Sequence, residues 1–462
     1  MGVLGKLFFL IIVGVAIFLG IKLNSLFQVP PLPHLENTWW AVGQPSKVDT
    51  SIKPFKINVP EKVLIDLKDR LKNARPFAPP LEGVHQDYGM NTDLLREIVE
   101  FWKTRYDWRE REKFLNQFPQ FITNIQGLDI HFIHVKPVRA NGLKVLPLLL
   151  VHGWPGSVRE FYEIIPKLTT PRKGDKFVFE VIVPSLPGYG FSQAASKPGL
   201  SAYHVSVIFK NLMERLGFNK YYIQGGDWGA VVVAGMSTLY PENILGVHSN
   251  MCIVDSPPAV LKYLLASLYP SAIIDEKYQD KMYPVSKLLQ YILLEFGYMH
   301  LQATKPDTVG VGLNDSPVGL AAYILEKFTT WTDPAWKSKP DGGLKEKFSY
   351  VDLLDNVMIY WVTNSITTSM RIYAETFNKA TNALQIPSIP VTVPSACLRL
   401  AHELFYMPDS LLSVKYKNLI QTTDVDVGGH FAAFEVPEIL AKDIWMSVSK
   451  MEQFHTRPKM SS

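Results

Sequence analysis

Apolar residues in the middle of the chain form short runs that alternate with amphipathic stretches. The run "LKVLPLLLV" (143–151) is almost wholly apolar, as in a strand buried on both faces of a parallel sheet. Further strand-like runs lie at 177–186, 220–225 and 244–251, and helix-like runs lie between them at 202–217 and 228–240. Strands that alternate with helices predict a parallel sheet with right-handed crossovers.

This alternation stops between about residues 254 and 376, where helical patterns rich in apolar and aromatic residues take over. It resumes with strand-like runs at 389–401 and 418–425, followed by a last helix after Pro437. An insertion of about 120 residues in a parallel-sheet scaffold predicts a helical lid.

Ahead of the sheet, residues 53–105 have helical periodicity. Pro60 suits the start of one helix, and Asn91 suits the cap of the next. The segment 120–137 alternates around Gln126-Gly127, which predicts a hairpin. We therefore expect an α/β fold with a mostly parallel central sheet, a helical lid insertion and an N-terminal extension of helices and a meander.

The N-terminus is strongly apolar. Fifteen consecutive residues, Leu7 to Ile21, carry no charge and are flanked by Lys6 and Lys22. A helix over 3–23 would be roughly 31 Å long, about one hydrocarbon core. A cleaved signal peptide is the competing interpretation, but no small-x-small cleavage site follows the run. The pattern favours an uncleaved, single transmembrane helix, and the flanking lysines leave its orientation open.

These patterns divide the chain into five parts: a transmembrane anchor (1–23), an N-terminal extension (24–143), the first part of the core (144–253), the helical lid (254–375) and the second part of the core (376–462).

Composition narrows the class of protein. The net charge is +4, from 47 basic and 43 acidic residues, and no basic stripe is present, so we expect no nucleic-acid partner. The two cysteines, Cys252 and Cys397, lie outside any C-x-x-C pair. We expect neither a disulfide framework nor a cysteine-based zinc site, although two cysteines still allow one disulfide.

The segment "YYIQGGDWGA" places Asp227 where a strand turns into a helix. Gly225-x-Asp227-x-Gly229 has the form of a nucleophile elbow, in which glycines permit a sharp turn and expose the central side chain. A plain helix N-cap explains the same five residues equally well. The pentapeptide alone leaves both interpretations open.

Two other segments favour the elbow. The first predicted strand of the parallel sheet ends in "HGWPGS" (152–157), a loop where elbow folds place a backbone N–H that binds an oxyanion. The segment "DVDVGGHFAAFE" places His430 after a Gly-Gly turn, between the last strand and the last helix. Nucleophile, acid and then histidine is the chain order of this scaffold.

The acid must then lie between Asp227 and His430. Glu403 stands just beyond the end of the strand-like run 389–401, where ligand-facing loops lie, and we favour it for this role. The competing carboxylates follow it in sequence: Asp409, Asp424 and Asp426.

Taken together, these motifs resemble those of the epoxide hydrolases of the α/β-hydrolase fold, specifically the microsomal branch. The resemblance also covers the anchor, the N-terminal extension and the lid stretches 295–328 and 369–377. Length and anchor are similar to those of the insect juvenile hormone epoxide hydrolases within that branch.

The resemblance implies that Asp227 attacks an oxirane carbon and forms a covalent ester, while two lid tyrosines, Tyr298 and Tyr373, protonate the departing oxygen. It further implies that His430, oriented by Glu403, activates the water that hydrolyses the ester. Backbone N–H groups of Trp154 and Trp228 would hold the oxyanion, and the products would be vicinal diols.

The implied partners are a lipophilic epoxide, water and a membrane, and the implied location is the endoplasmic reticulum or microsomal membrane. No cofactor or metal is implied, and His131 and His134 alternate within a predicted strand. Juvenile hormone and xenobiotic epoxides are both candidate substrates, and the sequence does not indicate the oligomeric state.

Two alternative functions stay open, a dehalogenase and a binding protein, whereas the absent elbow serine excludes a serine esterase. A haloalkane-type dehalogenase of the same fold also uses an elbow aspartate, but it would not need the lid tyrosines. A serine esterase would need Ser157 or Ser237, and neither lies in a suitable turn. A membrane-anchored binding protein without catalysis would have no need of the Asp-Glu-His set.

Overall fold

The computed structural model describes residues 24, 27–43, 48–138, 140 and 142–456. The predicted transmembrane helix lies outside these residues. Within them, no helix is both long enough and apolar enough to cross a membrane.

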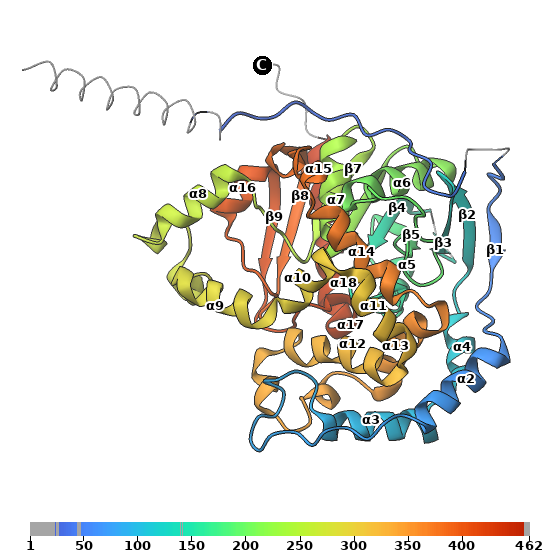
Figure 1. Cartoon of the computed structure of the whole chain (residues 1–462). Coiled ribbons are helices and arrows are strands. Elements are labelled where there is room, and N and C mark those ends of the chain that lie inside the picture. The colour runs from blue at the N-terminus through green and yellow to red at the C-terminus, as the bar shows by residue number, and fades with distance from the viewer. Residues whose placement is uncertain (1–23, 25–26, 44–47, 139, 141, 457–462) are drawn as a thin grey trace, which may run out of the picture.

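A nine-stranded sheet forms the centre of the molecule (Figure 1), in the order β1-β2-β3-β5-β4-β6-β7-β8-β9. Strands β4 to β9 pair in parallel, whereas β1, β2 and β3 pair antiparallel at one edge. This arrangement confirms the mostly parallel sheet. The strands are β1 (Lys53–Phe55), β2 (Gln120–Ile125), β3 (Leu128–Val135), β4 (Lys144–Val151), β5 (Phe177–Pro184), β6 (Tyr221–Gly225), β7 (Ile244–Ser249), β8 (Val391–Arg399) and β9 (Tyr416–Asp424).

Local sequence explains these elements. Leu149, Leu150 and Val151 of β4 are fully buried, as the unbroken apolar run predicts. The β2–β3 hairpin turns at Gln126 and Gly127, both with positive φ. Helices cover the sheet: α7 packs on β4, β6, β7 and β8, and α18 packs on β7, β8 and β9. The helices of the core are α5 (Ile165–Thr169), α6 (Ala202–Arg215), α7 (Trp228–Leu239), α16 (Asp409–Lys415), α17 (Ala432–Glu435) and α18 (Pro437–Thr456).

Between β7 and β8 the described chain is helical throughout (Figure 1). Its helices are α8 (Pro257–Ala266), α9 (Val285–Glu295), α10 (Gly297–Thr304), α11 (Pro306–Asp315), α12 (Pro317–Trp331), α13 (Tyr350–Thr363), α14 (Ile366–Thr376) and α15 (Lys379–Asn382), with short 3-10 turns between them. The lid boundaries at 254 and 375 stay a prediction.

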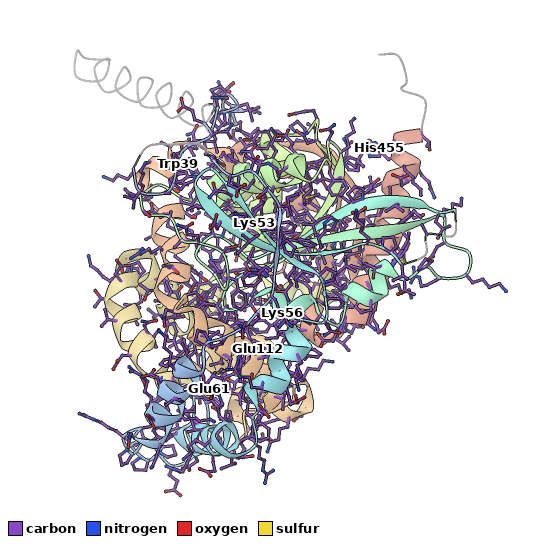
Figure 2. All side chains as sticks on the ribbon, turned by 90° about the vertical axis from the view of Figure 1, so that its right-hand side faces the viewer. Trp39, Lys53, Lys56, Glu61, Glu112 and His455 are labelled. Atoms are coloured by element: carbon purple, nitrogen blue, oxygen red, sulfur yellow. A yellow bond between two sulfur atoms is a disulfide. The ribbon has the colours of Figure 1, made fainter. Side chains whose placement is uncertain are left out.

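The N-terminal extension supplies the antiparallel edge strands β1, β2 and β3, which face the viewer in Figure 2. Its helices are α2 (Glu61–Lys72), α3 (Thr92–Thr104) and α4 (Trp108–Leu115). Of these, α2 and α3 contact the lid helices α12 and α13. The Asn91 side chain caps α3, as predicted, by accepting a hydrogen bond from the backbone N–H of Asp93. Glu112 of α4 accepts from the backbone N–H of Val59 at 2.7 Å, which ties the segment before α2 to α4.

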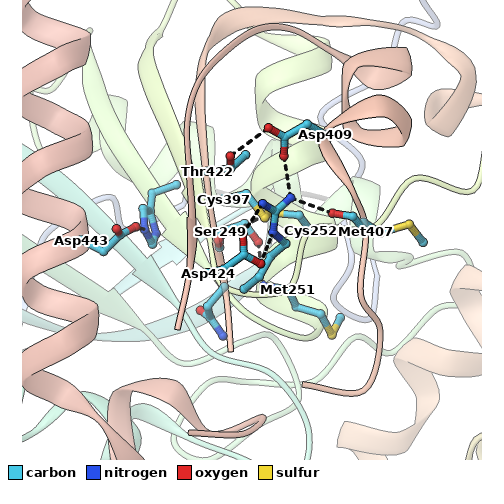
Figure 3. Close-up of a disulfide and its surroundings, with 12 residues drawn as sticks. Ser249, Met251, Cys252, Cys397, Met407, Asp409, Thr422, Asp424 and Asp443 are labelled. Atoms are coloured by element: carbon cyan, nitrogen blue, oxygen red, sulfur yellow. Dashed lines mark hydrogen bonds and ion pairs between the residues drawn. A yellow bond between two sulfur atoms is a disulfide. The ribbon is translucent and has the colours of Figure 1, made fainter. Parts of the chain in front are cut away.

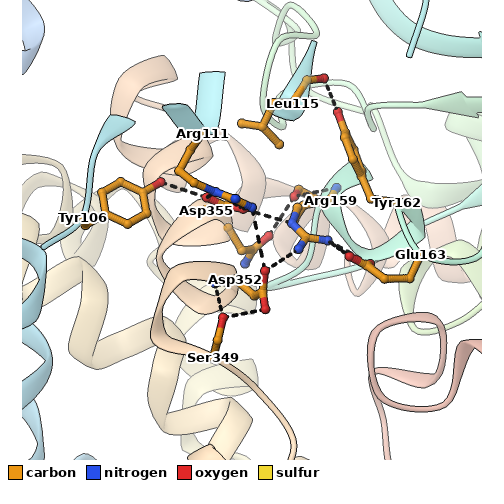
Figure 4. Close-up of polar contacts among 11 residues, drawn as sticks. Tyr106, Arg111, Leu115, Arg159, Tyr162, Glu163, Ser349, Asp352 and Asp355 are labelled. Carbon is orange, nitrogen blue, oxygen red and sulfur yellow. Dashed lines mark hydrogen bonds and ion pairs between the residues drawn. The ribbon is translucent and has the colours of Figure 1, made fainter. Parts of the chain in front are cut away.

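A buried charge network joins the extension, the core and the lid (Figure 4). Asp355 of α13 accepts from Arg111 of α4 at 2.6 Å and from Arg159 at 3.2 Å. Arg159 belongs to the 3-10 turn η1 (Val158–Phe161), which directly follows the loop after β4. It also donates to Asp352 at 2.7 Å. Arg159 and Asp355 are almost fully buried, so three distant segments share one set of compensating charges.

The two cysteines are paired (Figure 3), so the one disulfide that two cysteines allow is present, although their spacing made a disulfide framework unexpected. They are 145 residues apart in sequence, but β7 and β8 are neighbours in the sheet, with Ser249 opposite Cys397. Cys252 follows β7 and so lies beside Cys397, with the two Cα atoms 6.1 Å apart. Cysteine spacing along the chain does not reveal this proximity, because only the parallel pairing of the strands creates it.

Candidate active site

Asp227 lies at the sharp turn between β6 and α7. Its φ is 51°, a conformation that is rare for a residue with a side chain and that commonly marks functional positions. Gly229 permits the turn, because a Cβ there would lie 2.0 Å from the Val151 carbonyl oxygen. The Asp227 carboxylate makes no capping hydrogen bond to α7, so a helix cap does not explain this residue.

The carboxylate instead faces the loop after β4. Asp227 Oδ1 accepts a hydrogen bond of 2.8 Å from the backbone N–H of Trp154. Gly153 makes this approach possible, since a Cβ there would lie 2.2 Å from the same oxygen. Trp228 begins α7 immediately after Asp227, and among the described contacts its backbone N–H makes no hydrogen bond to the carboxylate.

His430 stands between two carboxylates. Its Nε2 lies 3.4 Å from Asp227 Oδ2, and its Nδ1 lies 2.7 Å from Glu403 Oε1. Burial disfavours the charged ring, but the negative charges of Glu403 and Asp227 outweigh that effect and hold the pKa of His430 well above its usual value. The structure thus brings together the three residues that the sequence places up to 203 positions apart.

The other candidate acids are occupied elsewhere. Asp409 and Asp424 each bind Arg399, both at 2.6 Å (Figure 3). Asp426 is exposed and pairs with Lys277. Of the four carboxylates considered from sequence, only Glu403 contacts His430 in the part of the chain that the structure describes.

Sequence reasoning missed Glu435, which shapes the loop that carries His430. Its carboxylate accepts hydrogen bonds from the backbone N–H groups of Gly429 and Phe431, at 2.7 and 2.8 Å. Burial raises the pKa of Glu435 to about 7, although these two N–H groups oppose the shift. The position of Glu435 four residues after Phe431, in "GGHFAAFE", is the feature of the sequence that could have indicated these contacts.

Tyr298 of α10 and Tyr373 of α14 lie above the elbow. Their ring centroids are 6.0 Å apart; the Tyr298 ring stacks on Trp154 and the Tyr373 ring meets the edge of Trp228 at 4.7 Å. Burial, together with the charge of Asp227, raises the pKa of both phenols well above 10. Both hydroxyls therefore keep their protons at neutral pH and are available as donors.

Two family models match the chain. One, for the epoxide hydrolase N terminus, covers residues 52–161, and the other, for the alpha/beta hydrolase fold, covers residues 147–385. Juvenile hormone epoxide hydrolase 1 of Ctenocephalides felis is 54% identical over 451 residues, which is 98% of this chain and 96% of that protein. The chain belongs to the epoxide hydrolase family.

Other members agree with this assignment. The family member epoxide hydrolase 1 of Oryctolagus cuniculus is 46% identical, over 91% of this chain and 94% of that protein. The crystal structure of juvenile hormone epoxide hydrolase from the silkworm Bombyx mori superposes with a TM-score of 0.89 at 51% identity, covering 91% of this chain and 99% of that one. These relatives give no support to the dehalogenase or to the inactive binding protein.

Within the described residues, no group of three or more histidine, cysteine, aspartate or glutamate side chains could hold a metal ion.

Proposed function

We propose that the chain hydrolyses lipophilic epoxides to vicinal diols through a covalent ester on Asp227. The observation that carries this proposal is the position of one carboxylate between the Trp154 N–H and the His430 ring, beneath two protonated tyrosines. A carboxylate is the appropriate nucleophile, because its ester has a carbonyl that water can attack. A serine would form an ether, which water does not readily cleave.

Ring opening would form one bond and break another. A carboxylate oxygen of Asp227 attacks an oxirane carbon, and the carbon–oxygen bond at that carbon breaks. The departing oxygen takes a proton from Tyr298 or Tyr373. A positioned acid of this kind typically contributes about 10²–10⁴-fold to the rate.

Ester hydrolysis would follow. Esterification removes the charge of Asp227, one of the two charges that raise the pKa of His430, so a larger fraction of the imidazole is neutral and able to accept a water proton. The water oxygen attacks the ester carbonyl, and the backbone N–H groups of Trp154 and Trp228 hold the oxyanion. Each such donor is typically worth about 2.7–4 kcal/mol. His430 takes a proton from the attacking water. The bond between the carbonyl carbon and the substrate oxygen then breaks, the protonated ring gives its proton to that oxygen, and the regenerated Asp227 carboxyl group releases the proton that restores the tyrosine hydroxyl. The diol leaves with an oxygen that came from Asp227.

The isotope test follows from this path. With excess enzyme in ¹⁸O-water, a single turnover should give unlabelled diol and place one ¹⁸O in Asp227, measured by peptide mass spectrometry. Label found in the first-turnover diol would rule out the ester. In His430→Gln the same epoxide should leave a stable adduct that intact mass detects, with Asp227→Asn as the control that forms none.

We infer the substrate class from the relatives' names and from the aromatic lid. The relatives from Ctenocephalides felis and Bombyx mori are named for juvenile hormone, whereas the relative from Oryctolagus cuniculus is named only for epoxides. We therefore propose juvenile hormone, with xenobiotic epoxides as the second candidate. In competition, juvenile hormone should be turned over with a higher kcat/KM than styrene oxide; the reverse order would favour the xenobiotic role.

We also propose that residues 3–23 anchor the chain in the endoplasmic reticulum or microsomal membrane, and that the five-part division made from the sequence holds. The uncharged run between Lys6 and Lys22 supports the anchor. A single span would keep the site close to the bilayer, where lipophilic epoxides concentrate.

A further inference from the structure

Two neighbouring lid helices expose apolar side chains to solvent. α9 has no buried residue, and α8 buries only Ala259 and Ala266. Both helices lie at the same flank of the molecule, away from the sheet (Figure 1). The exposed side chains of α8, the turn after it and α9 are Val260, Leu264, Leu265, Leu268, Tyr269, Leu289, Ile292, Leu293 and Leu294. Soluble surfaces rarely gather so many apolar groups without a partner.

The chain that follows the N-terminal apolar run reaches this same flank. Phe27, Gln28 and Val29 line a cleft of about 800 Å³ together with Leu265 of α8 and Tyr269 of the turn after it. Six residue steps separate Ile21 from Phe27, so the end of the apolar run lies within about 22 Å of the cleft. A membrane span ending at that point holds α8 close to the bilayer surface.

We propose that the exposed face of α8 and α9 docks on the lipid bilayer beside the N-terminal span. This inference rests on the proposed anchor and extends it, because the catalytic domain would then have a second attachment. α9 ends one residue before α10, the helix that carries Tyr298. A lipophilic epoxide dissolved in the bilayer would therefore reach the lid at the helix that adjoins the acid.

Depth-dependent quenching tests this face on the full chain in phosphatidylcholine vesicles. Because the native cysteines are paired, Leu268→Cys and Leu293→Cys offer single sites for the fluorophore NBD. Tyr88→Cys, on an equally exposed side chain of the N-terminal extension, is the control. Doxyl-labelled lipid should quench positions 268 and 293 at least threefold more than position 88.

Each of three other outcomes would overturn the docking proposal, and each would identify a different reason. Equal quenching at all three positions, with the protein still floating with vesicles, would overturn the docking face and leave the anchor intact. Protection of 268 and 293 by self-association in detergent, without lipid quenching, would assign the face to a second copy and overturn the proposal. Failure to float with vesicles would overturn the anchor and the face together.

A different observation concerns the hydrolytic water. A cavity of about 20 Å³ lies beside the elbow, room for one water molecule. Asp227, His430, Asn250 and Glu160 all line it. A buried water needs two to four polar partners, and these four side chains supply them. The cavity is therefore built for a water next to the proposed base and the proposed ester.

Glu160 is held in place by its neighbours. It lies in η1, and its carboxyl group fills the space beside Gly156, where a Cβ would lie 1.4 Å from Glu160 Oε1. Burial raises the pKa of Glu160 to about 8, so the group is largely protonated at neutral pH and can both donate to and accept from a water. Residue 156 must be glycine for the carboxyl to reach the cavity.

We infer that Glu160 is a positioning residue for the attacking water, holding it between its carboxyl group and the His430 ring. The inference rests on the proposed ester hydrolysis. This role would affect only the second half-reaction, ester hydrolysis, because a group that holds the attacking water is needed only after the ester has formed.

Single-turnover kinetics with intact-mass detection test this role. In Glu160→Gln, ester formation should stay within twofold of the wild type, while ester hydrolysis slows at least tenfold and the adduct accumulates. Gly156→Ala, which pushes the carboxyl aside, should give the same split, and Glu438→Gln on the exposed end of α18 should change neither step. Equal slowing of both half-reactions, or unchanged hydrolysis in both variants, would overturn the role; failure to form any ester in the wild type would instead overturn the proposed function.

Discussion

At the scale of single residues, the site depends on charges that change during the reaction. Asp227 and Glu403 both raise the pKa of His430 against a strong effect of burial. Only the Asp227 charge disappears when an ester forms. In the proposed mechanism the same imidazole is therefore a charged partner of the free nucleophile and a neutral base for the ester.

Asp227→Asn copies this loss of charge while keeping the shape of the side chain. We expect a lower pKa for His430 in the variant than in the wild type, because one of the two stabilising carboxylates is gone and Glu403 is retained. Titration of ring ¹³C shifts in histidine-labelled protein measures the change. A pKa equal to that of the wild type would show that Asp227 does not control the ring.

The same reasoning gives the pH dependence of turnover. Ester hydrolysis needs the neutral form of His430, so its rate should fall as pH drops below the pKa of the ring in the ester form. Pre-steady-state measurement of adduct decay across pH 5–9 gives this profile. A rate of decay that rises toward acid would exclude His430 as the base.

In the proposed mechanism the two tyrosines share the task of acid. Replacing either Tyr298 or Tyr373 by phenylalanine should slow ring opening, because only one hydroxyl then remains. The double variant should open the epoxide about 10²–10⁴-fold more slowly than the wild type. Ester formation in a single turnover is the measurement. Tyr323→Phe, on the third tyrosine ring that contacts Trp154, is the matched control and should open the epoxide ring at the wild-type rate. Full activity in the double variant would place the acid elsewhere.

At the scale of elements, turns and loops position the chemistry, and the charge network of α4, η1 and α13 holds those loops. Arg159 lies five residues after Trp154 and is almost fully buried. Its charge is compensated by Asp355, Asp352 and Glu163. Such a network adds little net stability as a whole, but removing one member leaves buried charges without partners.

Asp355→Asn tests the network. We expect a loss of about 3–5 kcal/mol in the free energy of unfolding, because Arg111 and Arg159 would then be buried beside a neutral group. Asp66→Asn is the matched control: its partner Arg70 is exposed, and surface pairs are worth about 0–1 kcal/mol. Thermal or denaturant unfolding of both variants measures the difference. Equal losses in the free energy of unfolding would mean that burial does not determine the cost of removing one charge of a pair.

At the scale of the whole molecule, hydrophobic patterning predicted the parallel strands, the hairpin and the helical insertion, because each depends on local periodicity. The turn glycines and the order of Asp227, Glu403 and His430 predicted which side chains would meet. The disulfide, Glu435 and the Arg159 network could not be predicted, since their contacts depend on how distant segments pack. The pairing of Cys252 with Cys397 needs the order of strands in the sheet.

The anchor is a prediction at this same scale. Full-length chain expressed in insect cells should stay in the membrane pellet after carbonate extraction at pH 11, because about 20 apolar residues suffice to span a bilayer. A chain beginning at residue 24 should leave the pellet to a greater extent. Equal extraction of the two chains would exclude residues 3–23 as the membrane anchor.

The charge network has a consequence for exchanging parts between relatives. The region matched to the N-terminal family model, 52–161, contributes Arg111 and Arg159, while their shared carboxylate, Asp355, belongs to the lid. A chimera that transplants residues 52–161 alone would combine the two cations of one parent with the anion of the other. Residues 52–161 and α13 therefore behave as one heritable unit, and a recombination point between them is tolerated only where both parents carry the same three charges.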